Sequence, residues 1–407
     1  MRVIAVLALA GSLLLVGFGS GAAAMWMLGS ELRTPNATAQ LGSNAVEVED
    51  FELTEQLILL EQIWDILQAE YILPEQLDAQ EMLHGAAAGF VSAVGDPHTA
   101  FVEPVRAAIM QEDMEGAFEG IGATVEMQEG ILTVVRPLPN SPAEKAGIQA
   151  GDEILEADGQ SLEGMDIMEA ITLIRGPRGS TVRLLVRRDN IEEPFIVSVT
   201  RDRIELQITE TRMLDGDIAY LSLSEFNAQS ARQVRSDLRE LLRDNPNGLI
   251  LDLRNNPGGY LQMAVDIAGE FLPRGALIVT ETQRGERDVD LRVSRAGVAL
   301  DIPMVVLVNG GSASASEIVA GAIQDHERGI LVGEATFGKG SVQQTHSLLD
   351  GSTLRVTIAK WILPGGRILN QDGLEPEIVV SMTPEDVAEG RDEQLERAVE
   401  YLLDLEP

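Results

Sequence analysis

The sequence predicts an α/β protein with a layered core, an inserted β-rich domain and a preceding helical region. Three observations predict it. From residue 217 onward, apolar runs typical of buried strands alternate with helical segments. Residues 115–203 contain short strand patterns on either side of one helical segment, and residues 47–104 are mostly helical in pattern. A chain of 407 residues has room for two or three domains of ordinary size.

The N-terminus predicts export. Residues 3–28 are uncharged, and a helix of that length spans roughly 39 Å, more than the apolar core of a bilayer at about 30 Å. Arg2 precedes the stretch and favours a cytoplasmic N-terminus. We expect residues 1–28 to be a single-pass anchor, with the remainder periplasmic or extracellular. The alternative is a signal peptide, cleaved near the alanines at 22–24, that releases a secreted protein.

The next two segments have distinct compositions. Residues 29–46 are rich in Gly, Ser, Thr, Pro and Asn, as linkers are. In the helical region, residues 47–104, one apolar stripe includes Leu57, Leu60 and Leu67, and no lysine or arginine occurs. We interpret its acidic side chains as a solvated face.

The composition excludes several functions. The net charge of −35 repels nucleic acids and anionic lipids, so we expect no nucleic-acid partner. The absence of cysteine excludes disulfides and thiolate catalysis. The four histidines are not spaced as metal ligands, and we expect neither a metal nor a cofactor. The 30 basic residues comprise 27 arginines and three lysines, namely Lys145, Lys339 and Lys360.

The elements follow from periodicity. In the β-rich domain we expect strands at 131–135 and 182–186 and a helix at 165–174. In the core, residues 204–382, we expect strands at 218–223, 249–253 and 303–308 and helices at 230–244, 261–271 and 314–325. Residues 383–407 are expected to form one acidic C-terminal helix.

Three stretches of the core contain candidate catalytic residues. Asn-Asn-Pro-Gly-Gly at 255–259 follows a buried strand, and its glycines expose backbone N–H groups where negative charge is favoured. Small residues at 309–316 open a helix and leave a serine exposed near its positive end. The third stretch, 333–344, contains Gly-x4-Gly-Lys, but Gly340 stands where a phosphate loop needs Ser or Thr, so that interpretation fails.

A lysine is the candidate base for that serine. A serine hydroxyl needs a base that removes its proton. A lysine supplies one if burial lowers its pKa, whereas arginine stays protonated. This chain uses arginine almost everywhere, yet it keeps Lys339 in a glycine-flanked loop.

Together these stretches resemble the C-terminal processing peptidases, which are tail-specific serine proteases with a crotonase-like α/β core. The resemblance includes Gly-Asp-Pro-His-Thr-Ala-Phe-Val-Glu-Pro at 95–104 and Gly-Leu-Glu-Pro-Glu at 373–377. It implies a serine endopeptidase that acts through an acyl-enzyme, with Ser314 as nucleophile, Lys339 as base and Gln343 orienting the lysine. It further implies an oxyanion hole formed by backbone N–H groups near Gly258 and Gly259 and that of Ala315.

The β-rich domain resembles a PDZ domain, on the evidence of Phe-Glu-Gly-Ile-Gly-Ala at 118–123 and the stretch from Ser141 to Leu155. The resemblance implies that the domain captures a C-terminal peptide by β-augmentation. The peptide carboxylate would bind at Gly120, Ile121, Gly122 and Ala123. Ile167 and Ile171 would accept an apolar final side chain, so we expect partners with apolar C-termini.

Two other functions are weighed against a protease. An acyl-thioester hydrolase could use the same fold and glycine-built oxyanion hole, but it needs no reader of peptide ends. A non-catalytic PDZ scaffold would not need Ser314, Lys339 and Gln343 together. Whether the protein is a homo-oligomer is left open.

Overall fold

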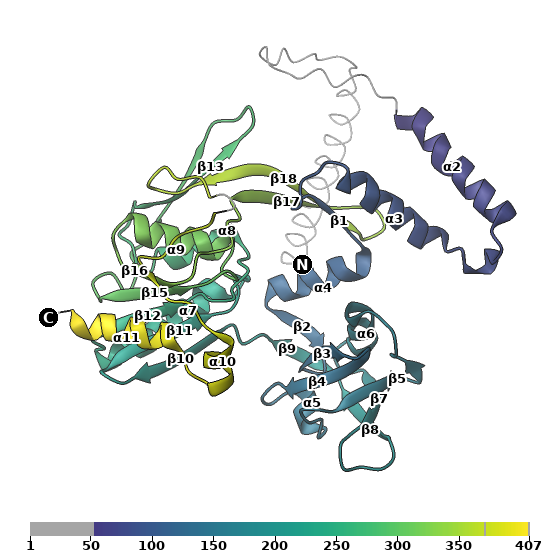
Figure 1. Ribbon diagram of the computed structural model, residues 1–407, viewed down its shortest axis with the longest axis horizontal. Coiled ribbons are helices and arrows are strands. Elements are labelled where there is room, and N and C mark those ends of the chain that lie inside the picture. Colours follow the sequence, from purple (N-terminus) through teal and green to yellow (C-terminus); the bar gives the residue numbers. More distant parts are fainter. Residues whose placement is uncertain (1–52, 370–371, 406–407) are drawn as a thin grey trace, which may run out of the picture. The chain divides into compact units, whose positions relative to one another are not determined.

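Figure 1 shows the computed structural model, which describes residues 53–369 and 372–405. The chain divides into two compact units, residues 1–77 and 78–407. The described part of the first unit consists of α2 (Leu53–Glu70) and the short 3-10 helix η1 (Pro74–Gln76). The expected anchor and linker lie outside the described residues. Among the helices that are described, none is both long and apolar enough to cross a bilayer.

The second unit starts with α3 (Ala79–Ser92), β1 (Ala100–Val102) and α4 (Pro104–Glu115). Asp78 caps α3 by accepting hydrogen bonds from the N–H groups of Gln80 and Glu81. The region expected to end at residue 104 therefore contains a strand, and a further helix begins at its last residue. Pro104 occupies the first turn of α4, where a missing N–H costs nothing, and Gly116 ends the helix at φ 78°.

The inserted domain is a β-sheet with two short helices. Its strands are ordered β3-β4-β5-β7-β8, which leaves β3 at an open edge. The entering strand β2 pairs antiparallel with the leaving strand β9, so the chain enters and leaves the domain at one place. The elements are β2 (Ala117–Gly120), β3 (Ala123–Gln128), β4 (Ile131–Pro137), α5 (Pro142–Lys145), β5 (Glu153–Ala157), β6 (Gln160–Ser161), α6 (Ile167–Ile174), β7 (Thr181–Arg187), β8 (Phe195–Thr200) and β9 (Asp202–Glu205).

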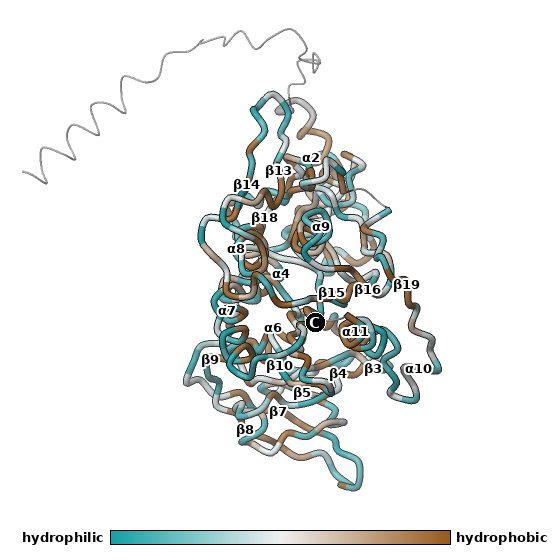
Figure 2. The backbone as a smooth tube through the Cα atoms, turned by 90° about the vertical axis from the view of Figure 1, so that its left-hand side faces the viewer, coloured by the Kyte–Doolittle hydropathy of each residue, from teal (hydrophilic) through white to brown (hydrophobic). Residues whose placement is uncertain are grey.

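The core contains a six-stranded sheet ordered β10-β11-β12-β15-β16-β19. All neighbouring strands are parallel except β10 and β11. Every residue of β12 and β15 is buried, and Figure 2 shows β15 in the hydrophobic colour. The elements of this layer are β10 (Thr209–Leu214), β11 (Ile218–Leu223), α7 (Ser230–Leu241), η2 (Leu242–Asp244), β12 (Gly248–Asp252), α8 (Leu261–Ala268), β15 (Met304–Val308), α9 (Ala315–Asp325), β16 (Ile330–Gly333) and β19 (Ile378–Val379).

The two faces of this sheet pack against different helices. Leu249 and Leu251 belong to a cluster with residues of α7, α8 and α9, whereas Ile250 belongs to a cluster with Leu402 of the C-terminal helix. Because side chains alternate along a strand, this sheet is the middle of three layers. A second sheet, ordered β1-β18-β13-β14 with β17 beside β18, adjoins the core. Its further strands are β13 (Leu277–Gln283), β14 (Val289–Arg292), β17 (Ser341–Ser347) and β18 (Thr353–Ile362).

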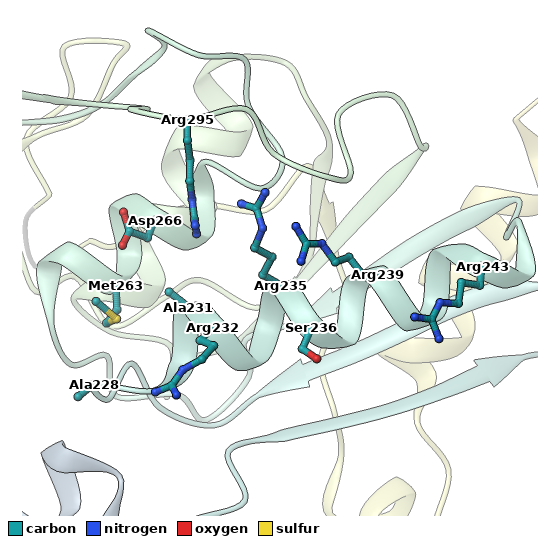
Figure 3. Close-up of a pocket in the computed structure, with 10 residues that line it drawn as sticks. All are labelled: Ala228, Ala231, Arg232, Arg235, Ser236, Arg239, Arg243, Met263, Asp266 and Arg295. Atoms are coloured by element: carbon teal, nitrogen blue, oxygen red, sulfur yellow. The ribbon is translucent and has the colours of Figure 1, made fainter.

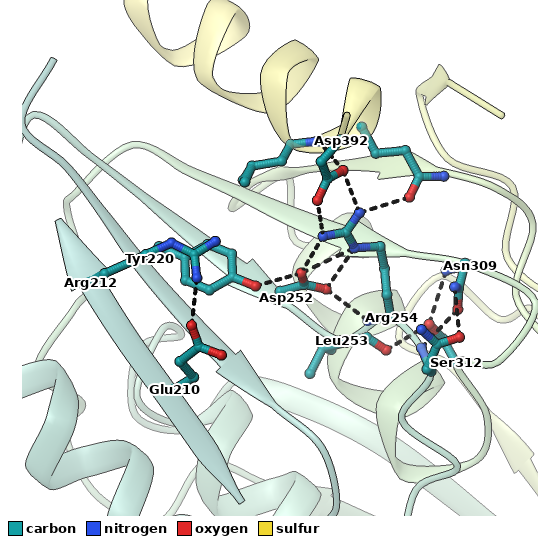
Figure 4. A network of polar contacts seen from close by, with 12 residues as sticks. Glu210, Arg212, Tyr220, Asp252, Leu253, Arg254, Asn309, Ser312 and Asp392 are labelled. Atoms are coloured by element: carbon teal, nitrogen blue, oxygen red, sulfur yellow. Dashed lines mark hydrogen bonds and ion pairs between the residues drawn. The ribbon is translucent and has the colours of Figure 1, made fainter. Parts of the chain in front are cut away.

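The C-terminal segment forms two helices instead of the one expected. They are α10 (Pro384–Glu389) and α11 (Glu393–Asp404), and Gly390 lies between them at φ 69°. Arg254 ties α11 to the core: it forms ion pairs with Asp392 at the start of α11 and with Asp252 at the end of β12 (Figure 4). The Tyr220 hydroxyl also donates to Asp252, over 2.8 Å.

Candidate active site

Strand register brings the three candidate stretches together. Asp252 at the end of β12 lies beside Leu307 of β15, and Val308 lies beside Gly333 of β16. The carboxyl ends of three parallel strands therefore meet at one edge of the sheet. The glycine turn follows β12, the serine turn follows β15 and the lysine loop follows β16, so chain segments far apart in sequence converge there.

Ser314 occupies a strained turn between β15 and α9. Its φ of 56° and ψ of −112° are costly for a residue with a Cβ. The neighbouring serines are engaged elsewhere: the Ser312 hydroxyl donates to the carbonyl of Leu253, and the Ser316 hydroxyl donates to that of Asn256. Both of these serines are fully buried, whereas Ser314 is half-buried. Of these three serines, Ser314 is the one that is not fully buried, and within the described residues its hydroxyl donates no hydrogen bond.

Lys339 lies in a partly buried loop. Burial lowers the pKa of its ammonium group, the nearby positive charge of Arg355 lowers the pKa further, and Glu317 acts in the opposite direction. In contrast, Lys145 at the end of α5 and Lys360 on β18 are exposed. Of the three lysines, Lys339 has the environment that a general base requires.

Glu317 joins the serine turn to the lysine loop. One of its oxygens, Oε2, accepts hydrogen bonds from the backbone N–H groups of Ser314, at 2.8 Å, and Lys339, at 2.9 Å. The other, Oε1, accepts from the N–H of Gly338 and the hydroxyl of Thr336. The carboxylate is fully buried and is satisfied by these four donors. Sequence reasoning missed it, although Glu three residues after an N-cap serine is the signature of a capping box.

Gln343 lies on β17 opposite Thr357 of β18. Its amide nitrogen donates to the hydroxyls of Ser341, at 2.8 Å, and Thr357, at 3.2 Å. Within the part of the chain that the structure describes, no hydrogen bond joins Ser314 Oγ to Lys339 Nζ, or Lys339 Nζ to Gln343. Catalytic hydrogen bonds of unliganded enzymes often form only when substrate is bound.

The glycine turn lies against the serine turn. A Cβ on Gly258 would come within 2.7 Å of the Ala313 carbonyl and 2.8 Å of the Ser314 Cβ, so only glycine fits. The Gly258 N–H, however, donates to the side-chain oxygen of Asn256, at 2.9 Å. It is therefore not a free oxyanion donor as expected. The N–H groups of Gly259 and Ala315 have no partner among the described residues.

A pocket of about 60 Å³ lies between β3 and α6 of the inserted domain. Of the residues expected to bind peptide, Ile121, Gly122, Ala123 and Ile171 line it. Ile167 does not; it packs, partly buried, against the domain core. Gly120 does not line the pocket either, and Arg175 forms part of the wall, where it pairs with Glu112 and Asp113 of α4.

No group of three or more His, Cys, Asp or Glu side chains suited to a metal occurs among the described residues. His326 is exposed at the end of α9, with its ring bonded to the Leu277 carbonyl. It lies at the opposite end of the helix from Ser314 and is not a member of the site.

The fold and these residues define the chain as a serine hydrolase with an α/β core and an inserted peptide-binding domain. The models of peptidase family S41 and of the PDZ domain match residues 217–380 and 133–188, respectively. The chain is 33% identical over 386 residues to the carboxy-terminal processing protease CtpB of Bacillus subtilis, with 93% of this chain and 78% of the relative covered.

A second relative, the carboxyl-terminal-processing protease of Synechocystis, is 34% identical over 357 residues, which are 85% of this chain and 83% of the relative. The solved structure of an S41-type protein from Bacteroides fragilis shares the fold at a TM-score of 0.52 and 16% identity, with 85% of this chain and 98% of the other covered. The chain belongs to the carboxyl-terminal processing serine proteases. It is a serine endopeptidase, and its PDZ domain implies binding of peptide C-termini.

Proposed function

We propose that this protease cleaves substrates with a Ser314–Lys339 dyad. The observation that carries the proposal is the buried Glu317 carboxylate, one oxygen of which bonds the backbone N–H groups of both residues. The lowered pKa of Lys339 supports it, because a neutral amine can accept the Ser314 proton. Gln343 orients the lysine in this proposal.

The reaction then follows a common acyl-transfer course. Neutral Lys339 takes the Ser314 proton while Oγ attacks the scissile carbonyl. Negative charge develops on the carbonyl oxygen, and the free N–H groups of Gly259 and Ala315 stabilise it, with Gly258 permitting the close approach of the two turns. The lysine ammonium protonates the leaving amine, and water then hydrolyses the acyl-enzyme with Lys339 again as base.

The PDZ domain selects the substrate in this proposal. The free edge of β3 accepts the substrate tail as an added strand, and the apolar pocket lined by Ile121, Val125 and Ile171 takes its last side chain. Apolar, uncharged C-termini are therefore the preferred tails. The uncharged stretch at residues 3–28 supports anchoring in the cell membrane, with the protease domain periplasmic or extracellular. Release after signal cleavage is the alternative.

A fluorophosphonate probe tests the nucleophile. Ser314→Ala is expected to abolish both labelling and proteolysis. Ser316→Ala is the matched control: its hydroxyl only bonds a carbonyl, so the variant is expected to melt at a lower temperature and still react with the probe. Labelling of folded Ser314→Ala would contradict the assignment, and loss of labelling in folded Ser316→Ala would show that the nucleophile lies at another serine.

A further inference from the structure

The turn at residues 96–99 is connected to Gln343 through one threonine of β18. Asp96 Oδ1 accepts the N–H of His98 at 3.0 Å, and Oδ2 accepts the Thr99 hydroxyl at 2.6 Å. The Thr99 oxygen in turn accepts the N–H of Thr357 at 3.1 Å. The Thr357 side chain also lies close enough to the Asp96 carboxylate to lower the pKa of that group. The turn thus holds the backbone of Thr357 through Thr99 and places Asp96 beside its side chain.

The donors and acceptors available on the side chains of Asp96, Thr357 and Gln343 decide which group donates in each contact. An ionised carboxylate only accepts hydrogen bonds, so the nearby Asp96 carboxylate attracts the single hydroxyl proton of Thr357 toward itself. The lone pairs of Thr357 therefore face Gln343, whose amide must present its N–H₂ group, as it does at 3.2 Å. The Gln343 carbonyl oxygen then points away from Thr357. Burial acts to raise the pKa of Asp96, but the hydrogen bonds from Thr357, Thr99 and His98 outweigh it and hold the pKa at about 2.

We propose that Asp96 is a positioning residue for catalysis: through Thr357 it fixes the amide of Gln343 so that the carbonyl oxygen is the atom offered to Lys339. This inference rests on the proposed function, because it assumes that Gln343 orients the lysine. The inference assigns a role in catalysis to the Gly-Asp-Pro-His-Thr stretch, which lies almost 250 residues before Lys339 in the sequence.

Thr357→Val tests the relay, since it removes the hydroxyl and keeps the shape. We expect kcat to fall about tenfold or more with KM little changed. The lysine ammonium also loses an acceptor, which lowers its pKa, so the acidic limb of the pH profile of kcat/KM moves to lower pH. Asp96→Asn is expected to have the same effects as Thr357→Val. Its amide can donate a hydrogen bond to Thr357, so the amide of Gln343 is no longer held in one orientation. Thr357→Ser keeps the hydroxyl and is expected to restore the profile.

The control is Thr345→Val on the adjacent strand β17, where the side chain is exposed. A Thr357→Val enzyme with an unchanged profile, or with reduced activity and an unmoved acidic limb, overturns the relay. Lys339→Ala is measured in parallel. If Lys339→Ala stays active, the proposed function fails; if it is inactive while Thr357→Val behaves as wild type, only the relay fails.

A second, independent observation is a basic groove on the core. Four arginines of α7 and its 3-10 extension line a groove of about 620 Å³, and Arg295 lines it from a neighbouring segment (Figure 3). Arg235 and Arg295 share the buried carboxylate of Glu270, at 2.8 and 3.1 Å. Arg232, Arg239 and Arg243 are exposed and have no ion-pair partner among the described residues. The opposite face of α7, including Val234 and Leu238, is buried.

The three unpaired arginines share one helix face, at positions i, i+7 and i+11, along roughly 16 Å. That length exceeds one phosphate group and suits a chain of spaced carboxylates. The net charge of −35 repels extended polyanions and anionic membranes, so a local cluster of positive charge favours a short acidic segment. We propose that this groove, here called the α7 arginine groove, binds an Asp- or Glu-rich segment of a protein partner.

Labelled poly-L-glutamate, titrated into the full chain at low ionic strength, tests this site. Charge reversal of Arg232, Arg239 and Arg243 to Glu is expected to weaken binding at least about tenfold. The same reversal at the exposed Arg183, Arg284 and Arg287 changes net charge equally and is expected to matter far less. Equal losses in both variants would overturn the groove. So would vesicles containing phosphatidylglycerol that bind in an arginine-dependent way while poly-L-glutamate does not, since that result makes it a membrane site.

Discussion

At the scale of single residues, the environment of each side chain decides its chemistry. Lys339 is half-buried near Arg355, whereas Lys145 and Lys360 are exposed. A lysine in water has an ordinary pKa near 10.5 and is almost fully protonated at neutral pH. The free-energy cost of burying a charge lowers the pKa of Lys339 and so favours its neutral form over that of an exposed lysine.

The lowered pKa of Lys339 predicts a pH dependence. The neutral amine is the active form, so kcat/KM is expected to rise as pH increases through a value below 10.5. Lys339→Arg is expected to lose activity as completely as Lys339→Ala, by about 10²–10⁴-fold or more, because arginine keeps its proton. Rates measured from pH 5 to 10 on one peptide test this, with Lys360→Arg as the control that keeps the profile. An active Lys339→Arg enzyme would rule out lysine as the base.

At the scale of elements, the site depends on the close approach of two turns. The glycine turn after β12 touches the serine turn after β15, and Asn256 holds the two together. The Asn256 side-chain nitrogen donates to the Leu223 carbonyl, and the Asn256 carbonyl accepts the N–H of Ala313 at 3.0 Å. Hydrogen bonds of Asn256 therefore hold together the chain segments at the carboxyl ends of the parallel strands β11, β12 and β15.

Gly258→Ala is expected to push these turns apart. The new methyl group would meet the Ala313 carbonyl at 2.7 Å and the Ala315 nitrogen at 2.9 Å, so an oxyanion donor is displaced. We expect kcat to fall about 10²-fold with a smaller effect on KM, as when one oxyanion donor is lost. Gly285→Ala is the control for backbone strain without steric collision. Gly285 also has a positive φ, 78°, but a Cβ there would meet no atom within 4 Å. Equal activity of the two variants would argue against the role of Gly258.

At the scale of the whole molecule, peptide capture and cleavage belong to different domains. The chain enters and leaves the PDZ domain through the paired strands β2 and β9. The wall of the PDZ pocket includes Arg175, whose guanidinium stacks on Phe118 and pairs with α4, the helix that precedes the domain. Ion pairs of Arg175 therefore link the PDZ pocket to α4.

Separate capture predicts that the substrate's C-terminal carboxylate affects the rate. Amidating it is expected to slow cleavage severalfold, because the turn at residues 118–123 loses its anionic ligand. The comparison uses free and amidated forms of one long peptide with an apolar tail. A short ester substrate that does not reach the PDZ pocket serves as control and is expected to react at the same rate in either form. Equal cleavage of both long peptides would remove the PDZ domain from substrate selection.

The sequence by itself determined the alternation of strands and helices, the inserted domain and Lys339 as the candidate base, whereas the choice of Ser314 among three serines rested on the resemblance to the C-terminal processing peptidases. It did so because these features are local: hydrophobic periods, glycine turns and a lysine kept among arginines are visible within a few residues. It placed the strand at 218–223 correctly and other boundaries to within a few residues. It did not show that Gly390 splits the last helix, nor that Ile167 packs in the core.

Only the tertiary structure decided which groups meet. The Glu317 carboxylate bonds the backbone N–H groups of Ser314 and Lys339, and the Asn256 side chain accepts the N–H of Gly258. Thr99 of the turn at residues 96–99 accepts the N–H of Thr357. These contacts join segments separated by up to some 260 residues, and strand order and register set them. A sequence pattern records which face a residue occupies, but a hydrogen bond depends on the position of both partners to within a few tenths of an ångström, and that is fixed only when the layers pack.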